Sequence, residues 1–585
     1  MKKANPDTLT GFLNYSGFIV FLLPFVLYFS SLSLGFVYFD DDVLVLENQA
    51  KISDPANLGK FFTTDVFFGK TVPYYRPLLN VALMAAARMG GTNPKVYHLL
   101  SVLIHCLNCL GLLWLLSLLE FTRTKSLMGA VLFSLHPLIA NAVFWIPALN
   151  DLLITLFGLL SFACFIRFTQ QKSGKFFFFH LLFFAGAFFS KESAIALPFL
   201  FLFYLVVKKQ RAADPYKVLL YVSWLAIIIF WFFLRKSATG MLRGDEQGLG
   251  AIIKNLPFLP EIVARFILPF DLAVMPVFSA FYTLSGIILI LLLSLAIFLD
   301  RQKNTPMILL GLGWFLAFAI PNMFIRQFNT SDSFDYLEHR ACLPSIGLLL
   351  MLLAILPAAW ADLRKRNVQL IFAALLVTFS VLTLMQQRKY RDGEAFWGSV
   401  LKVSPDRAWF HHFYGRYRFK QQDFARFEEQ LHEAVRLKAY GTFYYNLGMV
   451  ELVQKKNPEG AFPYFTRAIG MGETDPEMMK NFVGLCNESA IALSKNGEYA
   501  RAAERVETAL KYDPASTETM MNLAFFSIRL GNSPKAVSLW KQVIQIDPSV
   551  PNAYKNLSVY YLNNGNPGDS AGYYAAQYEK YGGKP

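Results

Sequence analysis

The sequence predicts an all-α chain in which a polytopic membrane domain is followed by a C-terminal α-solenoid. The 585 residues are 55% hydrophobic and only 16% charged, whereas soluble domains carry about a quarter charged residues. Apolar residues form long uninterrupted runs up to about residue 386, and beyond that point the chain is polar with a helical period. The polar part also repeats about every 34 residues. These observations exclude a disordered chain and argue against an ordinary soluble enzyme.

Eleven apolar segments are predicted to cross the membrane, because a spanning helix needs about 20 apolar residues. They lie near residues 16–37, 96–119, 126–145, 149–167, 176–190, 193–207, 216–234, 280–299, 306–325, 341–360 and 368–386. Residues 251–276 are also apolar, but Pro257, Pro260 and Pro269 interrupt them and several charges are present. This segment is therefore predicted to be an interfacial or re-entrant helix.

The net charge of +14 reflects membrane topology rather than nucleic-acid binding. Basic residues gather between the apolar segments, as the positive-inside rule expects of cytoplasmic loops. They include Lys2, Lys3, Arg123, Lys125, Lys172, Lys175, Lys208, Lys209, Arg211, Arg301, Lys303, Arg364, Lys365 and Arg366. With a cytoplasmic N-terminus, eleven spans place the first extracytoplasmic loop, residues 38–95, on the same face as the tail. A bacterial inner membrane with a periplasmic tail is expected, and an endoplasmic reticulum membrane with a lumenal tail is the alternative.

The polar tail has the spacing of tetratricopeptide (TPR) repeats. Four kinds of position recur 34 residues apart: Gly497, Gly531 and Gly565; Asp513-Pro514 and Asp547-Pro548; Asn522 and Asn556; Ala502 and Ala536. Weaker units precede them around Tyr445 and Trp409. We therefore predict a membrane domain over residues 1–386 and a TPR domain over residues 387–585. The groove of such a solenoid binds an extended segment of another protein, or else packs on the membrane domain.

The five cysteines predict neither a disulfide framework nor a metal site. Four of them lie in or at the edge of apolar segments, so Cys486 is alone in the tail. Cys106 and Cys109 have a metal-type spacing, but no two further ligands are near them in the sequence. No cofactor is expected to be required. A divalent metal is not indicated, although the acids of the first loop could hold one.

Three adjacent carboxylates, Asp40, Asp41 and Asp42, follow the first apolar segment directly. The mutual repulsion of adjacent carboxylates opposes ionisation of all three, which suits a general base or a cation site. A solvated helix end is the simpler interpretation of these residues.

Further ionisable residues lie at the predicted outer ends of the spans, and such residues at membrane depth are functional by default. They are His136, Asp151, Lys191, Glu192, Glu338, His339 and Arg340. A structural turn pair is the alternative interpretation of Lys191 and Glu192. All seven residues face the same outer surface in the predicted topology.

An ordered set of motifs resembles the transmembrane and TPR (TMTC-type) O-mannosyltransferases, which are GT-C glycosyltransferases. The motifs are FVYFDDDVLVLEN at 36–48, FFTTDVFFG at 61–69, YRPL at 75–78, NPKVYHLLSVLIH at 93–105, His136-Pro137 to Asp151, Ser190-Lys191-Glu192 and LPSIG at 343–347. The resemblance covers nearly the whole chain. It departs from the family pattern at Asn141, Leu149 and His339, which leaves the particular sugar and acceptor open.

The resemblance implies a GT-C-type membrane domain that transfers a sugar, with inversion, from a polyprenyl-phosphate donor to a hydroxyl of a protein. Asp40 and Asp41 match the paired acids that supply the catalytic base, and Asp42 is an extra acid. Cations must stabilise the leaving phosphate. The donor and substrate residues expected on this basis are Arg76, Lys191, Glu192, His339, Arg340, His136, Asp151 and Asp65.

Three alternatives remain open at this stage. A related GT-C enzyme would transfer the sugar to a glycan or a lipid. An oligosaccharide ligase would transfer whole glycans, although ligases usually place their key loop late in the chain. A non-catalytic membrane-anchored TPR scaffold would tolerate alanine at the acids of the first loop.

Overall fold

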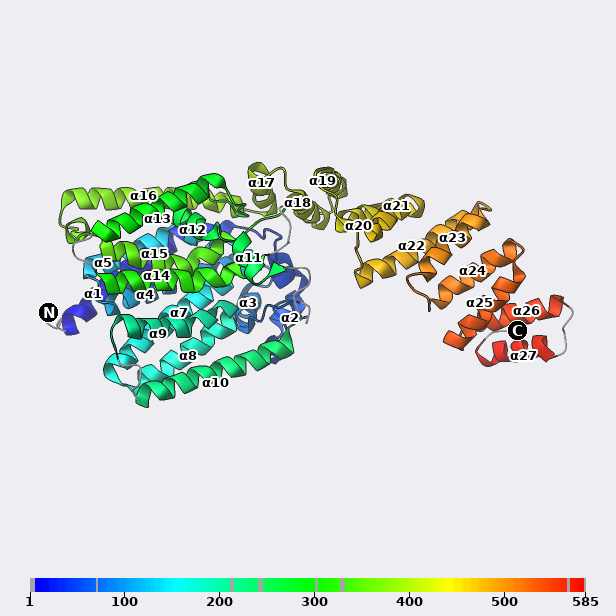
Figure 1. Cartoon of the computed structure of the whole chain (residues 1–585), viewed down its shortest axis with the longest axis horizontal. Coiled ribbons are helices and arrows are strands. Elements are labelled where there is room, and N and C mark those ends of the chain that lie inside the picture. The colour runs from blue at the N-terminus through cyan, green and yellow to red at the C-terminus, as the bar shows by residue number, and fades with distance from the viewer. Residues whose placement is uncertain are drawn as a thin grey trace. The chain divides into compact units, whose positions relative to one another are not determined.

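The computed structural model describes residues 6–69, 72–210, 215–239, 246–299, 304–326, 332–564 and 569–582 (Figure 1). Several residues used above lie outside these ranges, namely Lys2, Lys3, Arg211, Arg301, Lys303 and Gly565. The chain divides into two compact units, Met1–Phe410 and His411–Pro585. The sequence placed this division after residue 386.

The described residues of the first unit are mainly helical and include a pair of very short antiparallel strands, β1 (Glu246–Gln247) and β2 (Ile325–Arg326). Its helices are α1 (Pro6–Tyr28), α2 (Gln49–Ser53), α3 (Pro77–Gly90), α4 (Pro94–Leu118), α5 (Arg123–Leu135), α6 (Pro137–Phe144), α7 (Leu149–Gln171), α8 (Gly174–Ser190), α9 (Leu197–Val207), α10 (Pro215–Ala238), α11 (Leu249–Lys254), α12 (Phe258–Ile267), α13 (Ala280–Leu299), α14 (Thr305–Ala319), α15 (Cys342–Ile355), α16 (Arg366–Gln387) and α17 (Gly393–Val403). The predicted helical fold class is confirmed.

In the described part of the chain, eight helices are long and apolar enough to cross a membrane, or nine if the bent pair α5 and α6 forms one span. Two shorter apolar helices, Gly174–Ser190 and Glu192–Val207, account for the remaining predicted segments. Residues 251–276 contain α11 and α12, and neither helix qualifies as a span. The chain is therefore a membrane protein. Residues 251–276 differ from its membrane-spanning helices, as the sequence predicted.

The segment predicted as one helix over 126–145 is instead broken, with α5 and α6 meeting at an angle of 53°. The cause is His136-Pro137. A residue before proline avoids the helical conformation, and His136 accordingly has an extended backbone with ψ 124°. Its Nδ1 then accepts the N–H of Leu138 at 3.2 Å, which caps the start of α6.

The membrane helices differ strongly in how much of their surface the protein buries. In the most apolar stretch of each span, 83% of the residues are buried for Glu338–Ile355, against 6% for α13 and 11% for α16. The core therefore lies around α4, α7 and α15, and α13 and α16 lie at its edge (Figure 1). Where α13 touches α12, Gly286 allows the approach, since a Cβ there would lie 1.9 Å from the carbonyl oxygen of Pro260.

The second unit consists of antiparallel helix pairs with the TPR pattern. The helices are α18 (Ala408–Lys420), α19 (Phe424–Leu437), α20 (Gly441–Met449), α21 (Pro458–Gly470), α22 (Pro476–Lys495), α23 (Tyr499–Leu510), α24 (Thr517–Arg529), α25 (Ser533–Ile546), α26 (Pro551–Asn563) and α27 (Asp569–Lys580).

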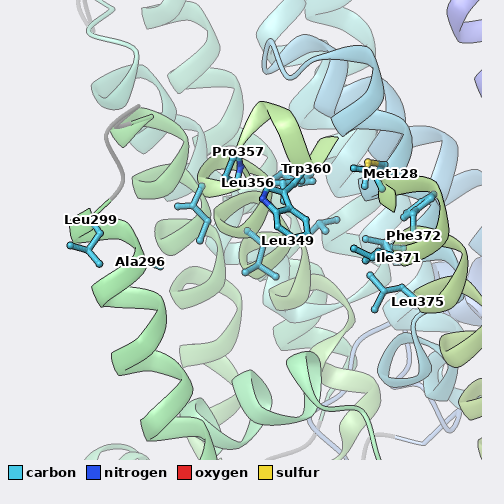
Figure 2. A pocket seen from close by; sticks show the side chains of 15 residues that line it. Met128, Ala296, Leu299, Leu349, Leu356, Pro357, Trp360, Ile371, Phe372 and Leu375 are labelled. Carbon is cyan, nitrogen blue, oxygen red and sulfur yellow. The ribbon is translucent and has the colours of Figure 1, made fainter. Parts of the chain in front are cut away.

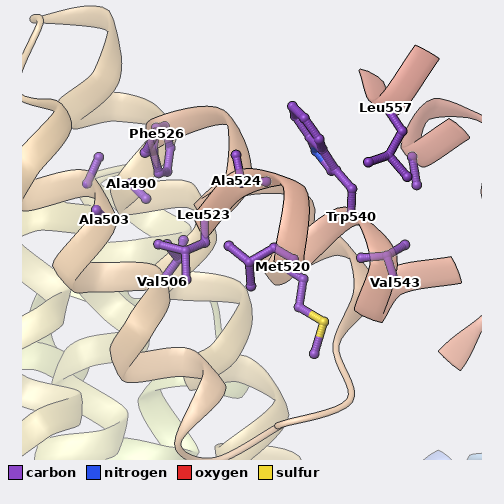
Figure 3. Packing of buried hydrophobic residues seen from close by; sticks show 14 of the residues in the cluster. Ala490, Ala503, Val506, Met520, Leu523, Ala524, Phe526, Trp540, Val543 and Leu557 are labelled. Carbon is purple, nitrogen blue, oxygen red and sulfur yellow. The ribbon is translucent and has the colours of Figure 1, made fainter. Parts of the chain in front are cut away.

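The residues that repeat in the tail have clear structural roles. Gly497 and Gly531 turn the chain between paired helices with φ of 80° and 77°, which glycine adopts without strain. Ala502 and Ala536 are fully buried in the hydrophobic cluster that joins neighbouring pairs. Figure 3 shows part of this cluster, with Ala490, Val506 and Leu523. Small side chains at Ala502 and Ala536 allow the helices to pack closely, so the 34-residue period reports helix packing.

Candidate functional site

The first loop places its three aspartates in three different environments. The carboxylate of Asp41 accepts the backbone N–H of Val37 at 2.7 Å and of Phe39 at 3.0 Å, and Asp41 is only 1% exposed. Asp42 is also buried, at the start of the short π-helix η2 (Asp42–Glu47). Asp40 has a positive φ of 68°, a conformation that non-glycine residues rarely adopt. Asp41 therefore holds the turn that presents Asp40.

Asp40 lines a cavity of about 420 Å³ with residues from distant parts of the chain. Arg76 comes from the start of α3, and Lys191 from the turn between α8 and the 3₁₀-helix η6 (Glu192–Ala196). His339 and Arg340 come from η8 (Glu338–Ala341), just before α15. Glu192 lines the cavity as well. The structure thus brings together six of the residues that the sequence singled out.

Ion pairs order the charges around this cavity. Arg76 Nε lies 3.3 Å from Glu192 Oε2, and Lys191 Nζ lies 2.6 Å from Asp151 Oδ1. Asp151 stands behind the cavity wall, and its Oδ2 is 3.7 Å from Nε2 of His339. Within the described ranges, Arg340 forms no ion pair. The guanidinium of Arg340 is therefore available to an anionic ligand.

Burial shifts the pKa of two groups at the site toward neutrality. Burial raises the pKa of Asp41 to about 8, with the charges of Asp42 and Asp40 adding to the rise and its backbone hydrogen bonds opposing it. Burial lowers the pKa of Lys191 to about 8, and the charges of Arg76 and Arg340 lower it further, against the attraction of Asp151. Both groups therefore titrate near neutral pH.

Sequence reasoning missed two residues of the cavity wall, Arg235 and Trp145. Arg235 Nη2 donates to the carbonyl of Pro73 at 3.1 Å, and its buried Nε has no hydrogen-bond partner in the described part of the chain. Trp145 Nε1 donates to the carbonyl of Phe39 at 2.9 Å, and the two rings stack at 5.3 Å. The available signal for Arg235 was a basic residue in the last turn of an apolar helix, α10, which the predicted topology ends at the outer face.

Besides Asp41, Asp42 and Asp151, two further predicted site residues, His136 and Asp65, do not line the cavity. His136 is buried at the bend between α5 and α6, and its Nε2 lies 2.8 Å from the carbonyl oxygen of Phe266. Asp65 is fully buried and accepts the backbone N–H groups of its own loop, those of Phe67, Gly69 and Val72. The structure gives both side chains a structural role.

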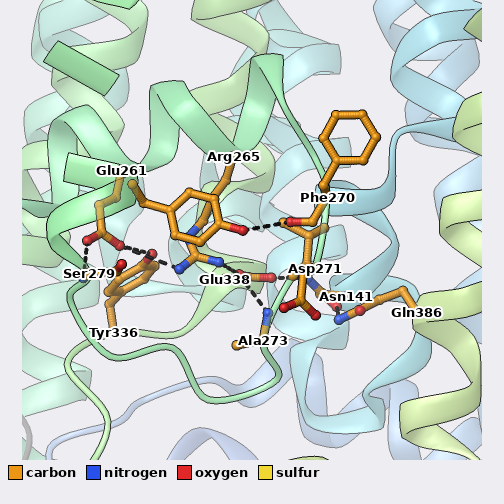
Figure 4. Close-up of polar contacts among 12 residues, drawn as sticks. Asn141, Glu261, Arg265, Phe270, Asp271, Ala273, Ser279, Tyr336, Glu338 and Gln386 are labelled. Atoms are coloured by element: carbon orange, nitrogen blue, oxygen red, sulfur yellow. Dashed lines mark hydrogen bonds and ion pairs between the residues drawn. The ribbon is translucent and has the colours of Figure 1, made fainter. Parts of the chain in front are cut away.

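A buried polar network supports the segment that carries His339 and Arg340 (Figure 4). The preceding residue, Glu338, accepts from Arg265 Nη1 at 2.7 Å, from Asn141 Nδ2 at 2.7 Å and from the N–H of Ala273 at 3.2 Å. Asn141 donates a hydrogen bond to Glu338. A glutamate at position 141 would instead place two buried carboxylates next to each other. The departure at Asn141 thus fits the neighbour that this chain provides.

The cavity combines cations that can bind an anionic ligand with a carboxylate that can accept a proton. Four cationic residues, Arg76, Lys191, Arg235 and Arg340, line the cavity with only two acids, Asp40 and Glu192. Charge-assisted hydrogen bonds from such cations bind phosphate strongly. The described residues contain no group of three or more His, Cys, Asp or Glu side chains placed to hold a metal ion.

Sequence comparisons match both parts of the chain. Residues 76–233 match the family described as dolichyl-phosphate-mannose-protein mannosyltransferase, and residues 414–476 and 493–558 match tetratricopeptide repeats. The solved TPR protein YrrB aligns with 34% of this chain and 95% of its own at 20% identity, with a TM-score of 0.21, which is too low to support an inference.

Curated relatives carry the same resemblance. The protein O-mannosyl-transferase Tmtc1 of Drosophila melanogaster is 29% identical over 180 residues, which is 30% of this chain and 20% of the relative. TMTC2 of Mus musculus is 31% identical over 160 residues, covering 25% and 18% of the two chains. The chain thus spans about a fifth of the length of these relatives. These matches confirm the predicted resemblance to TMTC-type proteins.

Proposed function

We propose that this membrane protein is a glycosyltransferase that moves a mannose-like sugar from a polyprenyl phosphate to a hydroxyl of a protein acceptor. One observation carries the proposal: Asp40 shares a single cavity with Arg76, Lys191, Arg235 and Arg340. A carboxylate among several cations is what this reaction needs, because a proton must be accepted while phosphate charge develops. The similarity to mannosyltransferases at residues 76–233 supports the same reaction class.

In the proposed step, the Asp40 carboxylate accepts the proton of the acceptor hydroxyl. The hydroxyl oxygen forms a bond to the anomeric carbon from the face opposite the phosphate, and the bond from that carbon to the phosphate oxygen breaks. The electron pair leaves with the polyprenyl phosphate, whose added charge Arg340, Arg76 and Lys191 stabilise. Attack from the opposite face inverts the anomeric centre.

Asp40 is a better candidate base than Asp41 because Asp40 lines the cavity and Asp41 does not. Both carboxylate oxygens of Asp41 accept backbone N–H groups. A pKa of about 8 also keeps Asp41 largely protonated at pH 7. We assign Asp41 a positioning role and Asp40 the role of base. Glu192 then orients Arg76, and His339 contacts Asp151, the ion-pair partner of Lys191.

The proposal places the cavity and the TPR tail on the extracytoplasmic face of a bacterial inner membrane, with the N-terminus in the cytoplasm. An endoplasmic reticulum membrane with a lumenal tail is the alternative. Polyprenyl-phosphate donors supply sugar where sugar nucleotides are absent, and the TPR groove binds the acceptor or a partner protein. The reaction as written requires no cofactor.

The test uses purified protein in nanodiscs with radiolabelled mannosyl polyprenyl phosphate and a membrane-free extract of acceptor proteins. Label in protein supports the proposal, whereas label in a lipid or free glycan product identifies a transferase with another acceptor. Arg340→Gln is expected to raise the KM for the donor by about 10- to 100-fold, because a hydrogen bond from a charged group contributes about 1.5–3 kcal/mol. Arg391→Gln, which removes an exposed arginine, is the matched control.

A further inference from the structure

A second cavity, of about 770 Å³, lies at the other end of α15 from the Asp40 cavity and is open rather than enclosed (Figure 2). Its walls are almost entirely apolar and come from α5, α13, α15 and α16. Representative lining residues are Met128, Ala296, Leu349, Trp360 and Ile371. Since α15 has 14 residues and rises about 1.5 Å per residue, the two cavities are roughly 20 Å apart along this helix.

This cavity exists because α13 and α16 stand away from the core. Few of the residues in their most apolar stretches are buried, 6% and 11% respectively. Ala296 and Leu299 of α13 face the cavity, as do Ile371 and Leu375 of α16 (Figure 2). A space between spanning helices that is lined by hydrocarbon and open to the side is filled by hydrocarbon in a membrane, because water has no polar partner there.

The mouth of the cavity carries positive charge. The turn from residue 361 to 367 joins two lining residues, Trp360 and Val368, and contains Arg364, Lys365 and Arg366. Arg364 pairs with Asp362 at 2.8 Å. The following two basic residues form no ion pair within the part of the chain that the structure describes.

Two more features of this end fit a lipid headgroup region. Lys125 of α5 donates its Nζ to the carbonyl of Leu353, a lining residue, at 2.8 Å. Trp360 is 53% exposed beside the basic turn, and tryptophan is enriched where a membrane meets water. Basic residues beside such a cavity attract anionic headgroups.

We infer that this cavity binds an acyl chain of an anionic phospholipid, whose headgroup contacts Lys365 and Arg366. The site is separate from the Asp40 cavity, so the inference does not depend on the proposed reaction. The phospholipid fills the space between α13, α16 and the core, and thereby fixes the edge helices.

The test measures quenching of tryptophan fluorescence by phospholipids with brominated acyl chains in nanodiscs. Brominated phosphatidylglycerol is expected to quench a saturable component that Trp360→Phe removes, at a mole fraction at least fivefold lower than brominated phosphatidylcholine. Lys365→Gln with Arg366→Gln is expected to abolish this preference. A matched double variant, Lys175→Gln with Lys209→Gln, is expected to retain it.

Two results would overturn the inference. Equal quenching by the two phospholipids in the unmodified protein would exclude an anionic-lipid site. Displacement of brominated phosphatidylglycerol by low amounts of polyprenyl phosphate would show that the cavity holds the donor chain instead. Ala296→Phe, which adds a ring to the cavity wall, provides a second check, since it should weaken the saturable component severalfold while the protein still elutes as a folded species.

Discussion

Removing Arg265 from the network in Figure 4 leaves the buried carboxyl of Glu338 without its cationic partner. Arg265 and Glu338 are 2% and 1% exposed, and their closest atoms are 2.7 Å apart. In Arg265→Gln, Glu338 keeps its bonds from Asn141 and Ala273 but loses its cation. Breaking a buried ion pair in this way lowers the free energy of unfolding by about 3–5 kcal/mol.

Replacing Glu338 instead of Arg265 is expected to lower the free energy of unfolding less. In Glu338→Gln, Arg265 still faces Glu261, with Nη2 and Oε2 3.6 Å apart, and lies 4.0 Å from the ring centre of Tyr282. The expected loss is therefore about 1–3 kcal/mol, as for one unsatisfied buried hydrogen-bonding group. In the double variant no charge remains at 338, and Glu261 still accepts from Tyr336 at 2.7 Å.

The assay is a double-mutant cycle, measured by detergent-driven unfolding of the purified protein in mixed micelles. We expect the double variant to be more stable than the sum of the single losses predicts, by about 1–3 kcal/mol. Arg391→Gln, at the exposed pair with Asp392, should change stability by less than about 1 kcal/mol. Additivity of the Arg265 and Glu338 changes within about 0.5 kcal/mol would refute the proposed pairing.

Three further predictions concern titration and packing. Because Lys191 has a pKa of about 8, it loses its charge, and with it the ion pair with donor phosphate, as pH rises through 8. The KM for the donor should therefore rise between pH 7 and 9 in the unmodified protein. It should not rise in Lys191→Arg, since arginine stays charged over this range. The pKa of Asp41 is raised on folding, so its contribution to stability is present below its unfolded pKa and is lost as pH rises to about 8. Unfolding experiments at pH 5 and 9 should show this loss, and Asp41→Asn should abolish it. Gly286→Ala places a Cβ 1.9 Å from the oxygen of Pro260 and should lower the free energy of unfolding by about 1–3 kcal/mol. Gly484→Ala, with open space around its Cβ, should be neutral or stabilising in the same measurement.

The main features of the fold were readable from the sequence because they depend on local patterns. Uninterrupted apolar runs identified the membrane helices, and the positions of Gly497, Gly531, Ala502 and Ala536 identified the paired helices of the tail. The break at His136 was missed because apolar composition continues across it. The conformational restriction before Pro137 was the signal that outweighed composition there.

The candidate site was predictable only as a set of residues on one face. Sequence alone does not distinguish three adjacent aspartates, because the difference between Asp40 and Asp41 arises from a turn in which Asp41 accepts two backbone N–H groups. The pairing of Arg265 with Glu338 joins residues 73 apart in the chain and has no local signature. Arg235 did have a local signal, its place in the last turn of an apolar helix, but its contact with the distant Pro73 has none.

The proposed reaction depends on Asp40 as the base. The single-turnover rate of sugar transfer from saturating labelled donor measures that role most directly. Asp40→Asn is compared with Asp54→Asn, an exposed acid of the same loop that caps a short helix. We predict that Asp40→Asn slows the chemical step by about 10²–10⁴-fold, the usual contribution of a general base, while Asp54→Asn reacts at the unmodified rate. A rate for Asp40→Asn within threefold of the unmodified protein would contradict the account.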